Sequence, residues 1–310
     1  MTAGPGTDAE DTLRERVANR LPAMPPAERR VAEYLRDHAQ SVIFSTAEEI
    51  GNATGTSDAT VVRTSKNLGY SGLPDLKRSI GLQIIDGTRP SVRLSQRIDG
   101  AGRETATLLD HVFSEASERL TETFRLIPPA EFDQAVELLA EAREVLAFGV
   151  GLSEIPARFL CMKMNRLGHP TRFVGAAGFL LADGLLGLRE HDAVVIYAPA
   201  RLTRELGVVI DHAQSVGAKT VLVTDSLGPA LAGRVDVSLP AVHSATGYTA
   251  EAFSSLLMTD CLLLGVAARD RDRSTSNSEL LHALRAALTP EAHPHGRQST
   301  RRRPPQEDGS

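Results

Sequence analysis

Two patterns of hydrophobic and polar residues run along this chain, and they predict two kinds of structure. Between residues 28 and 86, apolar side chains recur every three or four positions, and turn residues separate the stretches. Val31 and Leu35 share one helical face, and Leu76 and Ile80 share another. This spacing is typical of amphipathic helices. The first part of the chain is therefore predicted to be a small all-helical region.

From residue 144 onward, short apolar stretches alternate with longer helical patterns. The five expected strands lie in the segments EVLAFGVG, TRFVG, AVVIYA, KTVLVTD and VDVSLPA. Apolar strands that alternate with helices are typical of a parallel sheet covered on both faces. We expect an α/β fold for this part, a five-stranded parallel α/β/α sandwich.

A polar connector and one long helix are expected between these regions. Residues 87–103 show no sustained apolar period, whereas residues 104–126 have helical spacing. The apolar stripe of this helix, expected to be buried, is Leu109, Phe113, Ala116, Leu120 and Phe124. The helix either packs on the second domain or pairs with its copy in a dimer. The expected divisions are a flexible N-terminus (1–24), a helical domain (25–86), the linker and long helix (87–127), an α/β domain (128–270), and a C-terminal helix with a disordered tail (271–310).

Composition and charge narrow the possible functions. The 34 Lys and Arg residues against 39 Asp and Glu residues give a net charge of −5, so any DNA binding must be local. The two cysteines, Cys161 and Cys261, form no metal or disulfide pattern. No apolar leader or spanning segment is evident. We expect a cytoplasmic protein that does not interact with membranes and binds no metal.

Residues 44–72 carry the pattern of a helix-turn-helix. Ser45 and Glu48 have the spacing of a capping box, and Ser57 is placed to cap the second helix. Gly55 can adopt the positive φ of a sharp turn. We therefore expect two short helices joined by a tight turn.

The second of these helices is the candidate DNA-reading element. A major groove receives the N-terminal half of such a helix. The candidate base-reading residues are Ser57, Asp58, Thr60, Arg63 and Thr64. The candidate phosphate contacts are Thr46, Lys66, Ser71 and Lys77, with Arg78. The alternative is an ordinary helical bundle whose polar residues face solvent.

Two segments of the helical region, AERRVAEYLRDH and STAEEIGNATGTSDATVVRTSKNLGYSGLPDLKRSI, carry a family resemblance. They are similar to the N-terminal domain of RpiR-type bacterial transcriptional regulators. The resemblance implies that a linker helix and a sugar isomerase (SIS) domain follow, and it covers residues 25–270. Thr56 and Thr64 stand where the family more often has apolar residues.

Two turns of the α/β domain are the candidate effector-binding loops. In AFGVGLSE, Gly149 and Gly151 permit close backbone approach, and Ser153 Oγ with the following helix N-terminus suits an anion. The alternative is a turn that needs glycine only for its shape. A full GxGxxG is absent, so we expect no nicotinamide and no other cofactor.

The resemblance implies that the loop after the third strand is altered. Phosphosugar-binding SIS domains commonly read SxSGxT there, whereas this chain has Ala198 to Thr203 as APARLT. Arg201 can replace the lost donors, and Thr203 is retained. A phosphosugar held differently, another small molecule, or no ligand are the three alternatives.

The chain is expected to be no enzyme, because its potential bases form no recognisable catalytic pair. These residues are Glu205, His212, His243 and Glu251. The leading hypothesis is a ligand-responsive transcriptional regulator, a homodimer or homotetramer that binds double-stranded DNA and senses a small-molecule effector. The alternatives are a phosphosugar isomerase with an accessory helical domain, and a constitutive DNA-binding protein that uses its SIS domain only for assembly.

Overall fold

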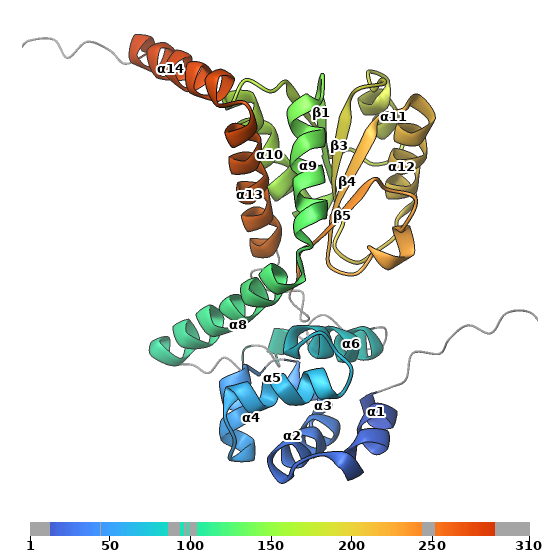
Figure 1. Cartoon of the computed structure of the whole chain (residues 1–310), viewed down its shortest axis with the longest axis vertical. Helices are drawn as coiled ribbons and strands as arrows, with labels where there is room; N and C mark the ends of the chain where they lie inside the picture. The colour runs from blue at the N-terminus through green and yellow to red at the C-terminus, as the bar shows by residue number, and fades with distance from the viewer. Residues whose placement is uncertain are drawn as a thin grey trace, which may run out of the picture.

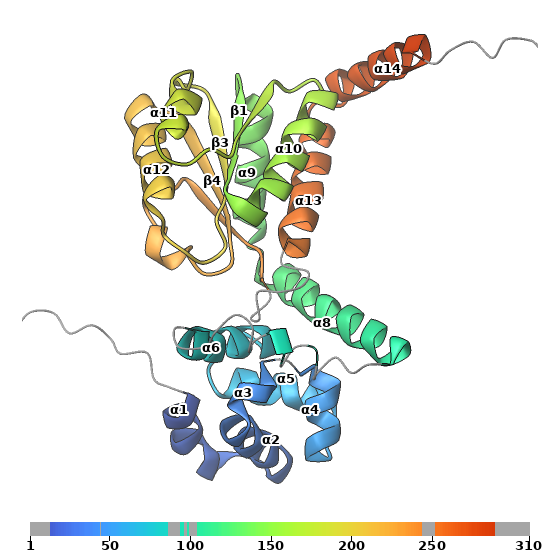
Figure 2. The same cartoon turned by 180° about the vertical axis from the view of Figure 1, so that it is seen from behind.

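The protein consists of a helical domain and an α/β domain with one long helix between them (Figures 1 and 2). The computed structural model describes residues 13–43, 45–85, 104–243 and 252–288, with residues 94, 95 and 98. Most of the expected connector, Glu251 and the expected tail lie outside these residues. Within them, no helix has the length and hydrophobicity needed to cross a membrane.

The helical domain packs its short helices around one core. Its helices are α1 (Leu13–Arg20), α2 (Pro26–Asp37), α3 (Ala39–Val42), α4 (Ala47–Thr54), α5 (Asp58–Asn67) and α6 (Leu73–Ile85), with a 3-10 turn at Leu21–Ala23. Val31, Leu35 and Leu76 are fully buried in this core, and Ile80 is nearly so. The helical periodicity in the sequence therefore predicted the buried positions correctly.

The helix-turn-helix is present, but the cap of its first helix lies one residue later than predicted. Thr46, not Ser45, is the N-cap of α4, and its partner is Glu49, not Glu48. Thr46 Oγ1 accepts from the Glu49 amide at 3.2 Å, and Glu49 Oε2 accepts from the Thr46 amide at 2.7 Å. Both spacings satisfy the same sequence pattern, so only the start of the helix distinguishes them.

The long helix α8 (Thr105–Leu126) forms as predicted, but its apolar stripe is not buried within this chain. Leu109 is 52% exposed, Phe113 70% and Phe124 80%. The buried residues of α8 are instead polar: His111, Glu115, Arg119, Glu122 and Thr123. The helix is amphipathic, but within this chain its polar side faces the neighbouring elements.

The α/β domain is built on a five-stranded parallel sheet, as predicted. The strands are β1 (Val145–Gly149), β2 (Thr171–Val174), β3 (Ala193–Tyr197), β4 (Lys219–Thr224) and β5 (Val237–Pro240), in the order β2-β1-β3-β4-β5. Every neighbouring pair is parallel. The order reverses between β1 and β3, and such a switch point opens a crevice at the carboxyl ends of the strands.

Helices cover both faces of this sheet and form a three-layer sandwich (Figures 1 and 2). One face is covered by α9 (Pro129–Glu141), α10 (Glu154–Arg166) and α13 (Phe253–Arg269), and the other by α11 (Phe179–Leu185) and α12 (Arg204–Val216). In β1, Val145 and Ala147 join the first core, whereas Leu146 and Phe148 join the second. Helix α14 (Arg271–Leu288) follows α13, which agrees with the expected C-terminal helix.

Candidate nucleic-acid interface and effector crevice

The turn between α4 and α5 holds the two helices close together. Gly55 has a φ of 63° and ends α4 in the left-handed conformation that glycine adopts without strain. A Cβ on Gly51 would lie 3.0 Å from the Thr56 carbonyl oxygen and 3.2 Å from the Asp58 amide nitrogen. Glycine at both positions thus lets the start of α5 pack directly against α4.

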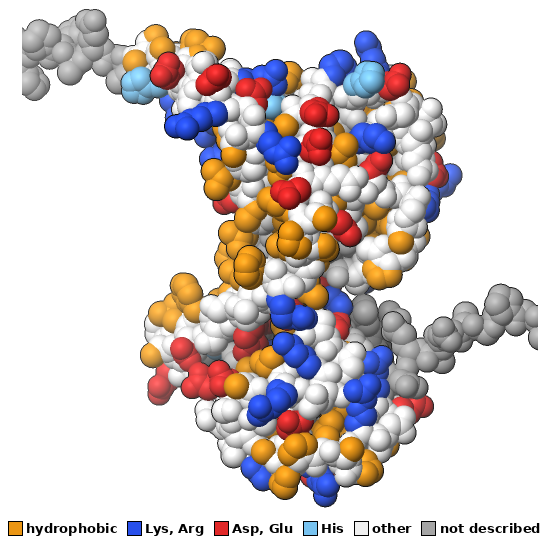
Figure 3. Space-filling model, viewed as in Figure 1, with side chains coloured by type: hydrophobic (Ala, Val, Ile, Leu, Met, Phe, Trp, Pro, Cys, Tyr) orange, Lys and Arg blue, Asp and Glu red, His pale blue; other side chains and the backbone are white. Residues whose placement is uncertain are grey.

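The exposed face of α5 carries part of the predicted DNA-reading set. Ser57, Asp58, Arg63 and Lys66 are exposed, and Ser71 beyond the helix is half-buried. Ser57 Oγ caps α5 by accepting from the Thr60 amide at 3.3 Å. Figure 3 shows Lys and Arg side chains gathered over this domain. The exposed polar residues of α5 remain the candidates for base contacts.

Two predicted base-reading residues are inside the domain instead. Thr64 is fully buried, and its hydroxyl donates to the Thr60 carbonyl at 2.8 Å. Thr60 is also buried, and its hydroxyl lies 3.0 Å from Ser57 Oγ. A threonine can return its hydroxyl to the preceding turn of a helix, which satisfies the buried oxygen. These two positions therefore support the helix and are not on its outer face.

Two predicted phosphate contacts are also buried in this arrangement. Thr46 is used as the cap of α4 and is almost inaccessible. Lys77 is 5% exposed, and its ammonium lies 3.4 Å from Glu118 Oε2 on α8. Arg78, half-buried, forms an ion pair with Asp225 of the α/β domain. Lys66 is exposed, and Ser71 is half-buried with its carbonyl accepting a hydrogen bond from Arg125 of α8.

Arg63 is oriented by a carboxylate that the sequence reasoning did not identify. Its Nε lies 3.2 Å from Glu28 Oε1, and Glu28 is buried on α2. Asn67 also donates to Glu28. A buried carboxylate with two donors holds the guanidinium at the outer face of α5. The AERR segment contained Glu28, but only the packing of α2 against α5 brings it to Arg63.

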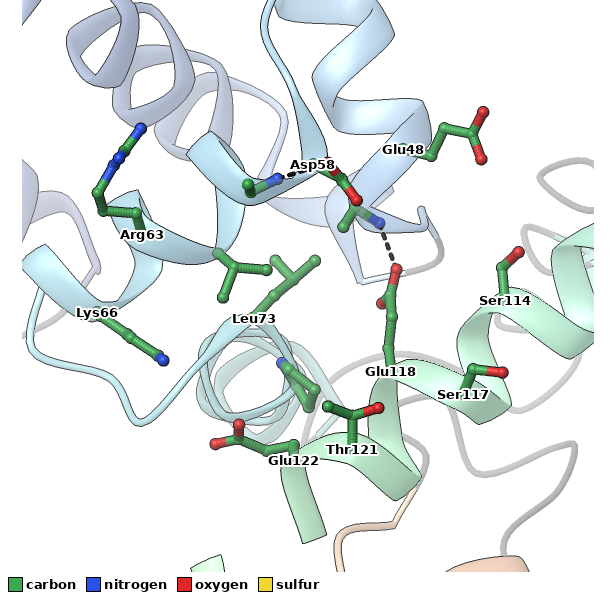
Figure 4. A pocket seen from close by; sticks show the side chains of 14 residues that line it. Glu48, Asp58, Arg63, Lys66, Leu73, Ser114, Ser117, Glu118, Thr121 and Glu122 are labelled. Atoms are coloured by element: carbon green, nitrogen blue, oxygen red, sulfur yellow. Dashed lines mark hydrogen bonds between the residues drawn. The ribbon is translucent and has the colours of Figure 1, made fainter. Parts of the chain in front are cut away.

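A cleft of about 690 Å³ separates the outer face of α5 from α8 (Figure 4). Asp58, Arg63 and Lys66 belong to the α5 wall. The α8 wall consists of Ser114, Ser117, Glu118, Thr121 and Glu122. Glu118 reaches across, and its Oε1 accepts from the Ala47 amide at 2.6 Å. The linker helix therefore lies directly beside the candidate DNA-reading surface.

A second polar contact joins α8 to α4. His111 Nδ1 lies 3.1 Å from Glu49 Oε1, and His111 is buried. Burial raises the pKa of Glu49, but hydrogen bonds from His111 and Thr46 outweigh it, so the pKa falls below its ordinary value. The Glu49 carboxylate consequently takes part in the cap of α4 and also contacts His111 of α8.

The candidate effector loops meet at the carboxyl ends of β1 and β3. Gly149 cannot carry a side chain, since a Cβ there would collide with the Ser153 carbonyl. Gly151 has a φ of 64°. Ser153 precedes α10 without capping it, so its hydroxyl has no cap bond to make. The two glycines thus have a structural explanation, and Ser153 is the residue left for a ligand.

The loop after β3 places neither of its two predicted effector-binding residues, Arg201 and Thr203, at the cavity beside Ser153. Thr203 caps α12, where its Oγ1 accepts from the Leu206 amide at 3.2 Å. Arg201 is exposed and forms no ion pair with another described residue. A small cavity of about 30 Å³ lies beside Ser153, Pro199, His243 and Ser255, and neither Arg201 nor Thr203 lines it. Of the five predicted effector-binding residues, Ser153 alone lines this cavity.

His243 and Ser255 complete this cavity from elements distant in sequence. His243 Nε2 lies 3.0 Å from Ser255 Oγ. Burial, with the positive charge of Arg119 nearby, lowers the pKa of His243 to about 4. The imidazole is therefore neutral at pH 7 and offers one donor and one acceptor. The sequence analysis considered His243 only as a possible base. Its proximity to Ser153 results from the tertiary fold, since the two residues follow different strands, β5 and β1.

Comparison with known proteins identifies both domains. Residues 12–84 match the helix-turn-helix domain of the rpiR family, and residues 138–264 match the SIS domain. The chain belongs to the RpiR family. This confirms the resemblance and the order of its domains. Among the described residues, no group of three His, Cys, Asp or Glu side chains is arranged to hold a metal ion.

The relatives of this RpiR-family chain include named transcriptional regulators and bifunctional proteins. It is 26% identical to the HTH-type transcriptional regulator HexR of Pseudomonas aeruginosa, over 91% of this chain and 97% of HexR. It is 32% identical to the bifunctional protein glk of Burkholderia thailandensis over 89% of this chain, but spans only 42% of that relative.

Two solved structures are similar to this RpiR-family chain. The sugar isomerase domain of an RpiR transcription factor from Sphaerobacter thermophilus is 26% identical and covers 57% of this chain and 98% of its own, with a TM-score of 0.53. Vibrio vulnificus NanR, solved with ManNAc-6P, covers 90% of this chain and all of its own, with 20% identity and a TM-score of 0.53. The likeness to NanR shows a shared fold.

Proposed function

We propose that this protein is a transcriptional regulator that binds double-stranded DNA through α5. The observation that carries the proposal is the outer face of α5, where Asp58, Arg63 and Lys66 are exposed and Glu28 orients Arg63. A guanidinium held in this way is suited to a base edge in a major groove. The membership in the RpiR family and the regulators among the relatives support this function.

The proposed effector is a small molecule with an anionic group, a sugar phosphate or a related metabolite, bound at the crevice between β1 and β3. Ser153, His243 and Ser255 supply polar groups at this crevice. Arg201 is exposed and lies two residues after Pro199, which lines the same cavity. NanR was solved with a phosphorylated sugar, which supports the same ligand class for this chain. The loop APARLT lacks the usual serines, so the ligand is held by other groups.

The proposed assembly is a homodimer or homotetramer. Apolar side chains gather along α8 and the adjoining end of α13 (Figure 3). Phe113, Phe124, Phe253 and Leu257 are all at least 46% exposed. An exposed apolar surface of this kind is typical of an interface between copies. A two-fold dimer then presents two α5 helices to a pseudo-palindromic site.

We propose regulation without catalysis. Relatives named as transcriptional regulators match most of their length, which supports a binding role. Isomerases among the structural neighbours share the α/β fold, but a fold alone does not assign an activity. The proposed DNA target places the protein in the cytoplasm.

Selection of genomic DNA fragments by the purified full chain tests the function. Arg63→Ala is expected to lose tenfold or more of the affinity for a selected fragment, since a base-reading arginine contributes about 1–3 kcal/mol. Arg189→Ala is the matched control: it removes the same charge from an exposed residue before β3, away from α5. Equal binding by both variants, or no selected fragment, contradicts the proposal.

A further inference from the structure

Helix α8 occupies positions that a DNA phosphate would use. Glu118 Oε1 accepts a 2.6 Å hydrogen bond from the Ala47 amide at the first residue of α4, and Glu118 Oε2 lies 3.4 Å from Lys77 Nζ. The free amides at a helix N-terminus and a nearby lysine are the groups that bind phosphate oxygens on DNA. One carboxylate of α8 thus satisfies both.

The cleft between α5 and α8 is too small for a duplex. Its volume of about 690 Å³ is that of a small-molecule pocket, whereas a recognition helix enters a major groove about 12 Å wide with a sugar-phosphate strand on each side. Glu118 and Thr121 on α8 face the α5 wall across this cleft (Figure 4). DNA and α8 therefore cannot lie against the same face of α5 together.

We infer that α8 is an autoinhibitory latch, with Glu118 in the place of a DNA phosphate, and that DNA binds only when α8 leaves the helical domain. This inference rests on the proposed DNA binding. The apolar side of α8 is turned outward in the latched arrangement, and polar contacts join the helix to the helical domain: Glu118 to Ala47 and Lys77, His111 to Glu49, and Arg125 to the Ser71 carbonyl. Polar contacts of this kind exchange readily for equivalent contacts to phosphate.

The latch is connected to the effector crevice through the segment after β5. Thr123 Oγ1 on α8 accepts from the Val242 amide at 3.0 Å, and the next residue, His243, lines the cavity beside Ser153. A ligand that displaces His243 shifts the attachment of α8. Ligand and DNA then favour different positions of the same helix, which is the coupling that a ligand-responsive regulator requires.

Charge-neutral variants of α8 test the latch in the full chain. Glu118→Gln keeps the shape but removes the charge, and it is expected to raise the affinity for a selected DNA fragment about tenfold at constant salt. Asp110→Asn is the matched control, since it removes one exposed acid from the same helix; its affinity is expected to stay within about twofold of wild type. Thr121→Glu adds an acid to the cleft wall and is expected to weaken binding, relative to Thr107→Glu outside it.

Equal affinities for Glu118→Gln and Asp110→Asn overturn the latch, and so does weaker binding by Glu118→Gln. A wild-type chain that selects no DNA contradicts the proposed function instead, so the two failures are distinguishable. Movement is measured separately with spin labels at Asn52→Cys on α4 and Thr107→Cys on α8, after both native cysteines are replaced by serine. The distance between the labels is expected to increase when DNA is added; an unchanged distance overturns the inference.

Discussion

Arg78 of α6 forms an ion pair with Asp225, the residue that follows β4, with 2.7 Å between Nη1 and Oδ1. This contact joins the helical domain directly to the α/β domain. The same Asp225 oxygen accepts from the His243 amide at 3.2 Å. A short chain of contacts thus runs from the DNA-binding domain to the residue that lines the effector cavity.

Replacing Asp225 is expected to destabilise this junction. Asp225→Asn removes the charge of the more buried of the two carboxylates that pair with Arg78, while the ion pair with Asp75 remains. The loss of one charged hydrogen bond costs about 2 kcal/mol. The measurement is the free energy of unfolding from urea denaturation. Asp211→Asn is the control, because Asp211 pairs with Arg234 at the exposed surface and is expected to cost less than about 1 kcal/mol. Equal losses in the two variants contradict a structural role for the junction.

The buried His243 predicts that stability falls in mild acid. Its pKa is about 4 in the folded protein and near 6.5 when unfolded, so between these values the unfolded state binds the additional proton. The contribution of His243 to the free energy of unfolding is therefore fully present above about pH 6.5, and it is lost as the pH falls toward 4. The decline from pH 7 to pH 5 attributable to this residue is about 2 kcal/mol. His243→Gln is expected to have a flatter profile of unfolding free energy against pH, and an unchanged slope contradicts the assignment.

Ser153 is expected to contribute to effector binding. Its hydroxyl lies at the cavity and makes no cap bond, so Ser153→Ala removes a hydrogen bond to the ligand and weakens affinity about fivefold. The assay is the shift in melting temperature with a series of sugar phosphates and with inorganic phosphate. Ser215→Ala is the control, because Ser215 is exposed near the end of α12 and donates to the His212 carbonyl. An identical ligand response from both variants contradicts this role.

The outward apolar side of α8 predicts self-association. Phe113→Glu places a charge on this surface and is expected to shift the sedimentation profile toward the monomer. Leu280→Glu, an equally apolar-to-acidic change on exposed α14, is the control and is expected to leave the profile unchanged. If Phe113→Glu sediments as wild type does, α8 is not part of the interface.

Local sequence patterns predicted the elements that depend on neighbours in the chain. The five strands, the helix-turn-helix and the long helix α8 all follow from periodicity, capping residues and turn residues. The positive φ of Gly55 was predictable for the same reason, because a sharp turn between two helices needs it. The cap of α4 was displaced by one residue because two adjacent pairs satisfy one pattern.

The site residues were harder to predict, because their exposure depends on contacts between distant segments. Thr64 and Arg63 are adjacent on α5, yet one is fully buried and the other reaches solvent. Glu28 and Arg63 are 35 positions apart but form one ion pair. His243 follows β5 and Ser153 follows β1, two strands that are not neighbours in the sheet, so only the tertiary fold brings them to one cavity.

The sequence by itself determined the two domain types, their order and the amphipathic character of α8, because these depend on residue spacing along a few turns of chain. The tertiary structure decided which side of α8 is buried. Its polar side pairs with Ala47, Glu49 and Lys77, since those groups gain charged hydrogen bonds there, while its apolar side is left for another surface. Periodicity identifies two sides of a helix, but only the chemistry of its neighbours decides which one they cover.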